Sequence, residues 1–84
     1  MVTMKLLVPP VLREYAGGSE LDVSGATVAE ALSGVPEALR VRVVDGQGRV
    51  FPYLLLFRND EATTVEARVG SDDVIEIVAA AEGG

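Results

Sequence analysis

Apolar and polar side chains alternate along several short stretches of the chain, with the period of a half-buried β-strand. The first stretch places Met4, Leu6 and Val8 on one face and the charged Lys5 on the other. The run from Tyr53 to Phe57 is apolar throughout, which predicts a strand in the middle of a sheet. The strands predicted in this way cover residues 3–8, 19–24, 53–57 and 74–78.

The hydrophobic period changes at Thr27, where the clearest helix signal begins. Residues 27–30 have the form of a capping box, in which the Thr27 hydroxyl accepts from the Glu30 amide and the Glu30 carboxylate returns to the amide of Thr27. Apolar side chains follow at helical spacing, and Gly34 ends the helix. The valine-rich residues 41–44 predict a short extended piece.

The order strand, strand, helix, strand, strand predicts an α+β protein, in which one main helix covers one face of a mixed four- to five-stranded sheet. We expect the first and last strands to be parallel neighbours at the sheet centre, because the helix lies in the crossover between them. The 84 residues have room for one domain, predicted to span residues 1–78. Residues 79–84 are predicted to form a flexible C-terminal tail.

The composition argues against several kinds of chemistry. Without cysteine or histidine, the chain has no disulfide, thiol nucleophile, imidazole base or zinc site of the usual kind. A net charge of −6 disfavours nucleic acid and favours partners with a basic surface. No stretch has the roughly 20 apolar residues of a membrane span, and the N-terminus lacks the charged region of a signal peptide. We therefore expect a cytoplasmic protein that binds neither membrane nor metal and is not itself an enzyme.

The sequence ends in Gly83-Gly84. Two residues without a Cβ form a thin, flexible end that can enter a narrow channel and present its carboxylate to another protein. At an average glycine usage of about 7%, such a pair also arises by chance in roughly one chain in 200. The two glycines therefore indicate a functional C-terminus only if the preceding residues form a folded domain that exposes them.

Over its whole length the chain resembles the ubiquitin-like sulfur carriers of the MoaD/ThiS type, which have the β-grasp fold. The residues that carry the resemblance lie after the first strand, at the start of the helix, in two turns and at the end. They are Leu12-Arg13-Glu14, Ala26 to Leu32, Asn59, Asp73-Val74-Ile75 and Gly83-Gly84.

The resemblance implies that other proteins act on this chain. An E1-like adenylating and sulfurtransferase enzyme would use ATP and Mg²⁺ to convert the Gly84 carboxylate to an acyl-adenylate, and a persulfide sulfur would then replace AMP to leave a thiocarboxylate. A synthase that accepts the sulfur would use it for molybdopterin, thiazole, cysteine or a specialised thio-metabolite. In the molybdopterin case the chain would be the small subunit of the synthase. The chain itself would bind no cofactor.

Two other functions remain open. Gly84 could form isopeptide bonds with lysines of target proteins, as in a ubiquitin-like modifier. The chain could also be a plain β-grasp interaction domain with an inert tail.

Strand parity, together with the family alignment, predicts the surface that meets partners. Leu7, Leu55, Phe57 and Val78 would form an outward apolar patch beside the tail, and large exposed patches mark interaction sites. Glu82 stands immediately before the two glycines, where small or uncharged residues are more usual in the family. We expect Glu82 to influence which activating partner fits.

Overall fold

The computed structural model describes residues 2–80 of the chain. Its elements are β1 (Val2–Leu7), η1 (Pro10–Leu12), α1 (Arg13–Ala16), β2 (Glu20–Gly25), α2 (Val28–Ser33), α3 (Glu37–Val43), β3 (Leu54–Arg58), β4 (Glu61–Ala62) and β5 (Val74–Ala79).

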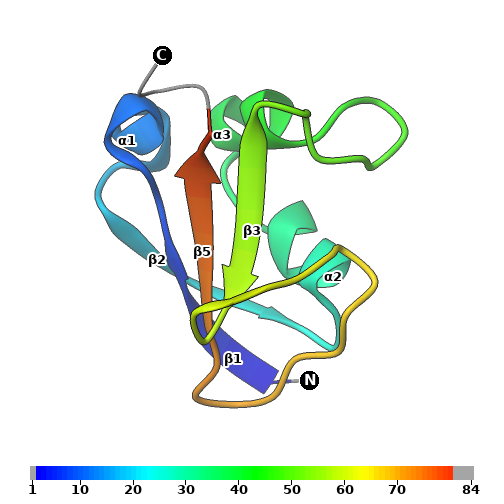
Figure 1. The fold of residues 1–84 in the computed structure, drawn as a ribbon. Coiled ribbons are helices and arrows are strands. Elements are labelled where there is room, and N and C mark those ends of the chain that lie inside the picture. The colour runs from blue at the N-terminus through cyan, green and yellow to red at the C-terminus, as the bar shows by residue number, and fades with distance from the viewer. Residues whose placement is uncertain (1, 81–84) are drawn as a thin grey trace.

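The strands form one mixed five-stranded sheet in the order β2-β1-β5-β3-β4. β1 and β5 are parallel neighbours at its centre, with Leu6 opposite Ile75, and each has an antiparallel strand on its other side. The predicted pairing of the first and last strands is therefore confirmed. In Figure 1, α1 and α3 lie at the end of the sheet where β5 ends.

The core lies between the inner face of the sheet and the helices. Alternate strand residues point into it as the sequence predicts, and Leu6 and Ile75 are fully buried. Burial of these apolar side chains is the main favourable term in folding. The buried core includes Met4, Leu6, Leu12, Val28, Leu32, Leu39, Val43, Leu54, Leu56, Ile75 and Ile77.

The start of α2 contains most of the predicted capping box. The Thr27 hydroxyl accepts from the Glu30 amide at 3.2 Å, as predicted. The Glu30 carboxylate accepts at 2.8 Å from the amide of Ala26, one residue earlier than the predicted Thr27. The amides of Val28 and Ala29 donate to carbonyls of residues 67 and 65, so the loop before β5 satisfies two donors that a helix start leaves open.

The prediction of an extended piece over residues 41–44 is wrong, because α3 occupies Glu37–Val43. Pro36 supplies the extended residue before the helix. Leu39 and Val43, one helical turn apart, are 0% and 1% exposed and pack into the core. Burial of this stripe outweighs the modest preference of valine for strands. The sheet is therefore covered by two helices of similar length.

A small polar network fixes the start of β5 against the end of β3. The Asp73 carboxylate accepts from the Gly70 amide at 2.8 Å, from Asn59 Nδ2 at 2.9 Å and from the Arg58 guanidinium at 3.3 Å. The Asn59 side-chain oxygen accepts in turn from the Val74 amide at 2.9 Å. These bonds, the Gly70 amide first and Asn59 next, hold the pKa of Asp73 below its ordinary value.

We expect Asp73→Asn to reduce the free energy of unfolding at neutral pH and to make stability less sensitive to acid. The folded pKa of Asp73 lies below the unfolded value of about 3.9. Its contribution is therefore present above that value and is lost as the pH falls through the folded pKa. Urea unfolding of both proteins between about pH 7 and pH 2 measures the difference. A gap that does not shrink on acidification would contradict this account.

Candidate functional site

The register of the sheet brings the four predicted apolar residues together on its outer face. Leu55 lies opposite Val78 across the β3–β5 ladder. Leu7 in β1 and Phe57 in β3 lie opposite the same residue of β5, one on each side. Leu7, Leu55, Phe57 and Val78, here called the outer patch, therefore occupy neighbouring positions on three adjacent strands.

The outer patch remains accessible although it lies on the central strands. Leu55 is 46% exposed, and its three companions are half-buried. Their neighbours Leu54 and Leu56 are 5% and 7% exposed and face the core. The predicted parity of β3 is therefore confirmed, and the patch has the accessibility that a docking surface needs. Its binding role stays a prediction.

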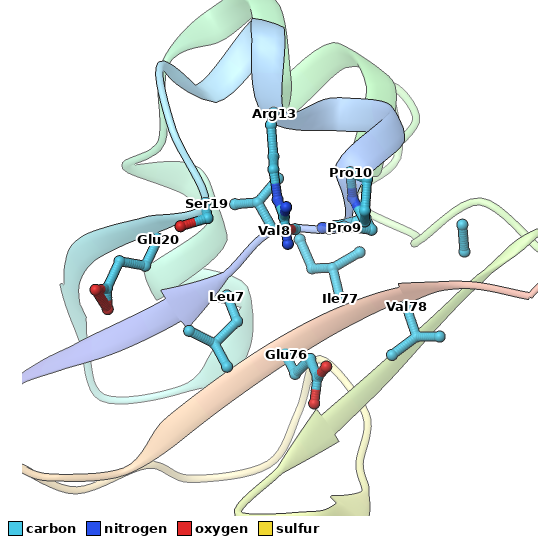
Figure 2. Close-up of a pocket in the computed structure, with 11 residues that line it drawn as sticks. Leu7, Val8, Pro9, Pro10, Arg13, Ser19, Glu20, Glu76, Ile77 and Val78 are labelled. Atoms are coloured by element: carbon cyan, nitrogen blue, oxygen red, sulfur yellow. The ribbon is translucent and has the colours of Figure 1, made fainter.

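A groove lies beside the last residues of β5. The pairing of β1 with β5 ends at Leu7, and Pro9-Pro10 then turns the chain away, because proline has no amide hydrogen for a ladder. β5 continues to Ala79, still paired with β3 on its other side. The resulting groove of about 360 Å³ is lined by residues 7–10, Arg13, residues 19–20 and residues 76–79 (Figure 2).

Arg13 reaches into this groove from α1 (Figure 2). Its Nε donates to the Val8 carbonyl at 2.9 Å, which ties α1 to the end of β1. Gly17, at φ 82°, ends α1 in a left-handed conformation and turns the chain towards β2. Arg13 is one of the residues that carry the sequence resemblance, but the sequence did not predict the groove that it lines. The Pro9-Pro10 pair is the signal that indicates an early end of β1.

The end of β5 is braced by α1, α3 and β3. The Ala80 amide donates to the Tyr53 carbonyl at 2.7 Å, and the Tyr53 hydroxyl donates to the Arg42 carbonyl at 3.0 Å. The Arg42 guanidinium lies 3.7 Å from the centre of the Tyr15 ring, a cation–π distance. The last described residues are thus held by a connected set of contacts.

Glu82, Gly83 and Gly84 lie outside the described residues. Within residues 2–80, no group of three or more acidic or other ligating side chains could hold a metal ion. No helix in that part of the chain is long and apolar enough to cross a membrane.

Comparisons by sequence give no match, either to a protein-family model or to a curated protein. Solved structures do match. SAMP1 from Haloferax volcanii is 27% identical with a TM-score of 0.84, and the match covers 98% of this chain and 99% of that one. CysO in the Amycolatopsis orientalis BexX/CysO complex is 27% identical with a TM-score of 0.86, covering 96% and 99%. A putative molybdopterin converting factor subunit 1 from Pyrococcus furiosus is 15% identical with a TM-score of 0.68, covering 92% and 95%, and shows the fold alone.

The chain therefore has the ubiquitin-like β-grasp fold, and the predicted fold class is confirmed. Within that class, its structural neighbours include SAMP1 and CysO, so the resemblance to ubiquitin-like sulfur-carrier and modifier proteins found in the sequence is confirmed as well. One of these neighbours, CysO, is seen in a complex with BexX.

Proposed function

We propose that this chain is a sulfur carrier whose C-terminal Gly84 is adenylated and converted to a thiocarboxylate. The observation that carries the proposal is the course of β5, the strand that leads towards the C-terminus. This strand lies at the sheet centre, passes through the outer patch and is braced at its end. A C-terminus ending in two glycines that follows such a strand would be offered to a partner beside the outer patch, which supports the proposal.

The proposed chemistry divides the work between carrier and partner. A carboxylate is a poor electrophile, so an E1-like enzyme transfers AMP from ATP to Gly84 and releases pyrophosphate, with Mg²⁺ bound by that enzyme. A persulfide sulfur then attacks the acyl carbon and the bond to AMP breaks. A second thiol attacks the other persulfide sulfur, leaving the thiocarboxylate and a disulfide on the partner side. The carrier contributes the acyl carbon of Gly84, and its C-terminal residues bring that carbon to the partner's active site.

The tail is long enough for this role. Ala80 is held by the Tyr53 carbonyl, and the four residues beyond it, fully extended, would span at most roughly 14 Å, enough to reach a catalytic centre below a partner's surface. Gly83 and Gly84 lack side chains that would widen the passage. We propose that a synthase accepts the sulfur in the cytoplasm, in a pathway for molybdopterin, thiazole, cysteine or a specialised thio-metabolite.

A second candidate function is conjugation to proteins through Gly84. The observation that favours it is a TM-score of 0.81 and 26% identity to the Haloferax volcanii small archaeal modifier protein 1, over 92% of this chain. Modifier and carrier share the adenylation step, and they differ in the nucleophile that follows.

Intact mass spectrometry separates the two functions. The chain is incubated with each adenylating enzyme of its source organism, ATP, Mg²⁺ and a persulfide donor, with a mixture lacking ATP as the control. A carrier gains the mass of one oxygen-to-sulfur exchange at its C-terminus. Higher-mass conjugates without that exchange would favour the modifier, and no ATP-dependent change with any of these enzymes would contradict both.

We expect Leu55→Ser to raise the KM for the carrier in adenylation by about tenfold, the effect of losing one apolar anchor at an interface. Thermal stability should change little, because Leu55 is 46% exposed. Val41→Ser is the matched control, since Val41 is 47% exposed but lies on α3, away from the outer patch. Pyrophosphate release against carrier concentration gives the KM. Equal values for the two variants would argue against docking through the patch.

A further inference from the structure

Glu76 occupies the centre of the apolar outer patch. Leu7 on β1 and Phe57 on β3 lie directly opposite it on its two sides. Val78 follows two residues later along β5 and shares its face. Figure 2 shows the side chains of Leu7, Glu76 and Val78 on the same side of the sheet. The Glu76 carboxylate is therefore carried by a residue that has an apolar neighbour on each flanking strand.

No basic side chain in residues 2–80 forms an ion pair with this carboxylate. The nearby cations are engaged elsewhere: Lys5 pairs with Asp22 at 2.8 Å, and Arg58 pairs with Asp73 at 3.3 Å. Arg13 lines the groove with Glu76, but its Nε is bonded to the Val8 carbonyl, and Figure 2 shows it approaching from the α1 side.

The surface around Glu76 has room for an incoming side chain. Glu76 lines the groove beside β5 and also a second hollow of about 280 Å³, formed with Leu7, Val74, Asn59 and Asp60. The acids Glu20 and Asp60 line these hollows as well, so their local charge is negative. A cation that enters here meets Glu76 between two apolar walls.

Docking through the outer patch would remove water from Glu76. A carboxylate that loses its hydration without gaining a partner opposes association, so a wholly apolar partner surface fits this patch poorly. A second copy of this chain is also disfavoured, because a two-fold pairing of the patches would bring acidic residues together in a protein of net charge −6.

We propose that the outer patch docks a partner protein that places an arginine or lysine side chain opposite Glu76, inside an otherwise apolar contact. Arginine suits the position best, because its planar guanidinium can bond both carboxylate oxygens while its faces pack on apolar side chains. The inference rests on the proposed function in one respect, namely that the partner is the activating enzyme or the sulfur acceptor. In this proposal Glu76 contributes to the choice of partner, and the Gly84 carboxylate is the group that reacts.

A small probe tests this surface without any partner enzyme. The ¹⁵N-labelled chain is titrated with phenethylguanidinium, which joins an aromatic ring to a guanidinium, and separately with phenethyl alcohol and 3-phenylpropionate. We expect the cation to shift the amides of the outer patch and Glu76 more strongly than the neutral or anionic compound does. Equal shifts by all three, or shifts centred elsewhere, would overturn the proposal.

Glu76→Gln and Glu66→Gln form a matched pair for this titration. Both remove one negative charge, but Glu66 is exposed in the loop between β4 and β5, away from the outer patch. Glu76→Gln should weaken binding of the cation at least about threefold, the scale of a partly exposed ion pair, and Glu66→Gln should not. Equal affinities of the two variants would overturn the proposal. Patch amides that shift with protein concentration would instead indicate a second copy and overturn it too.

The adenylation assay gives an independent readout. Glu76→Gln should raise the KM for the carrier about tenfold with kcat unchanged, because the contact forms on docking and does not touch the reacting carboxylate. If the wild-type chain is activated and Glu76→Gln behaves identically, the inference is overturned and the proposed function stands. If the wild-type chain is not activated, the proposed function fails, and the titration alone decides the inference.

Discussion

Gly25→Ala is expected to destabilise the protein by about 3 kcal/mol, combining overpacking with a strained backbone conformation. Gly25 ends β2 and has a φ of 157°, which side chains rarely adopt. A Cβ placed there would lie 2.7 Å from the Glu30 Cβ and 2.9 Å from the Ala31 amide nitrogen. These atoms belong to the first turns of α2 and cannot rotate away, so β2 and α2 would have to separate.

Urea and thermal unfolding measure this effect, and Gly46→Ala provides the control. A Cβ at Gly46 meets nothing within 4 Å, so its free energy of unfolding should change by at most about 0.5 kcal/mol. For a domain of this size, the loss at Gly25 corresponds to a melting temperature lower by roughly 15 °C. Similar losses in the two variants would show that α2 does not constrain Gly25.

The strands and their buried faces were predictable because alternation is a local signal that the sheet geometry preserves. Leu6 and Ile75 face the core for this reason. α3 was missed because valines at 41, 43 and 44 favour an extended chain locally, and the burial of Leu39 and Val43 that decides the matter is a tertiary effect. Gly25 gave no signal, since the atoms that exclude its Cβ come from the following helix.

In the candidate site, too, local features were predictable from the sequence and long-range features were not. Strand parity alone placed Leu7 and Val78 outward, whereas the all-apolar run of β3 fits either face and only the family alignment placed Leu55 and Phe57 outward. The position of Glu76 between Leu7 and Phe57 depends on the registers of two ladders, and no local pattern encodes them. Predicting the groove also requires the relative lengths of β1 and β5, since β5 continues beyond the point where its pairing with β1 ends.

Adding one alanine after Gly84 is expected to reduce thiocarboxylate formation at least about 100-fold, the cost of misplacing a reacting group by an ångström or more. An extra residue moves the carboxylate by up to about 3.5 Å and puts an amide where the adenylating partner needs an acid. The change lies beyond the described residues, so the contacts that brace Ala80 and β5 are unaltered and the melting temperature should stay the same. Intact mass after activation measures the exchanged product.

The same alanine added before Met1 serves as the control, because it changes length and mass equally and leaves the Gly84 carboxylate free. This control should be exchanged as fully as the wild-type chain. If the chain extended at its C-terminus is exchanged equally well, Gly84 is not the reactive residue, and the proposal of a carrier acting through its terminal carboxylate fails. If neither extended chain is exchanged while the wild-type chain is, added length or altered docking rather than terminal identity limits activation. The comparison of Leu55→Ser with Val41→Ser would then test the outer patch separately, because these substitutions leave both termini intact.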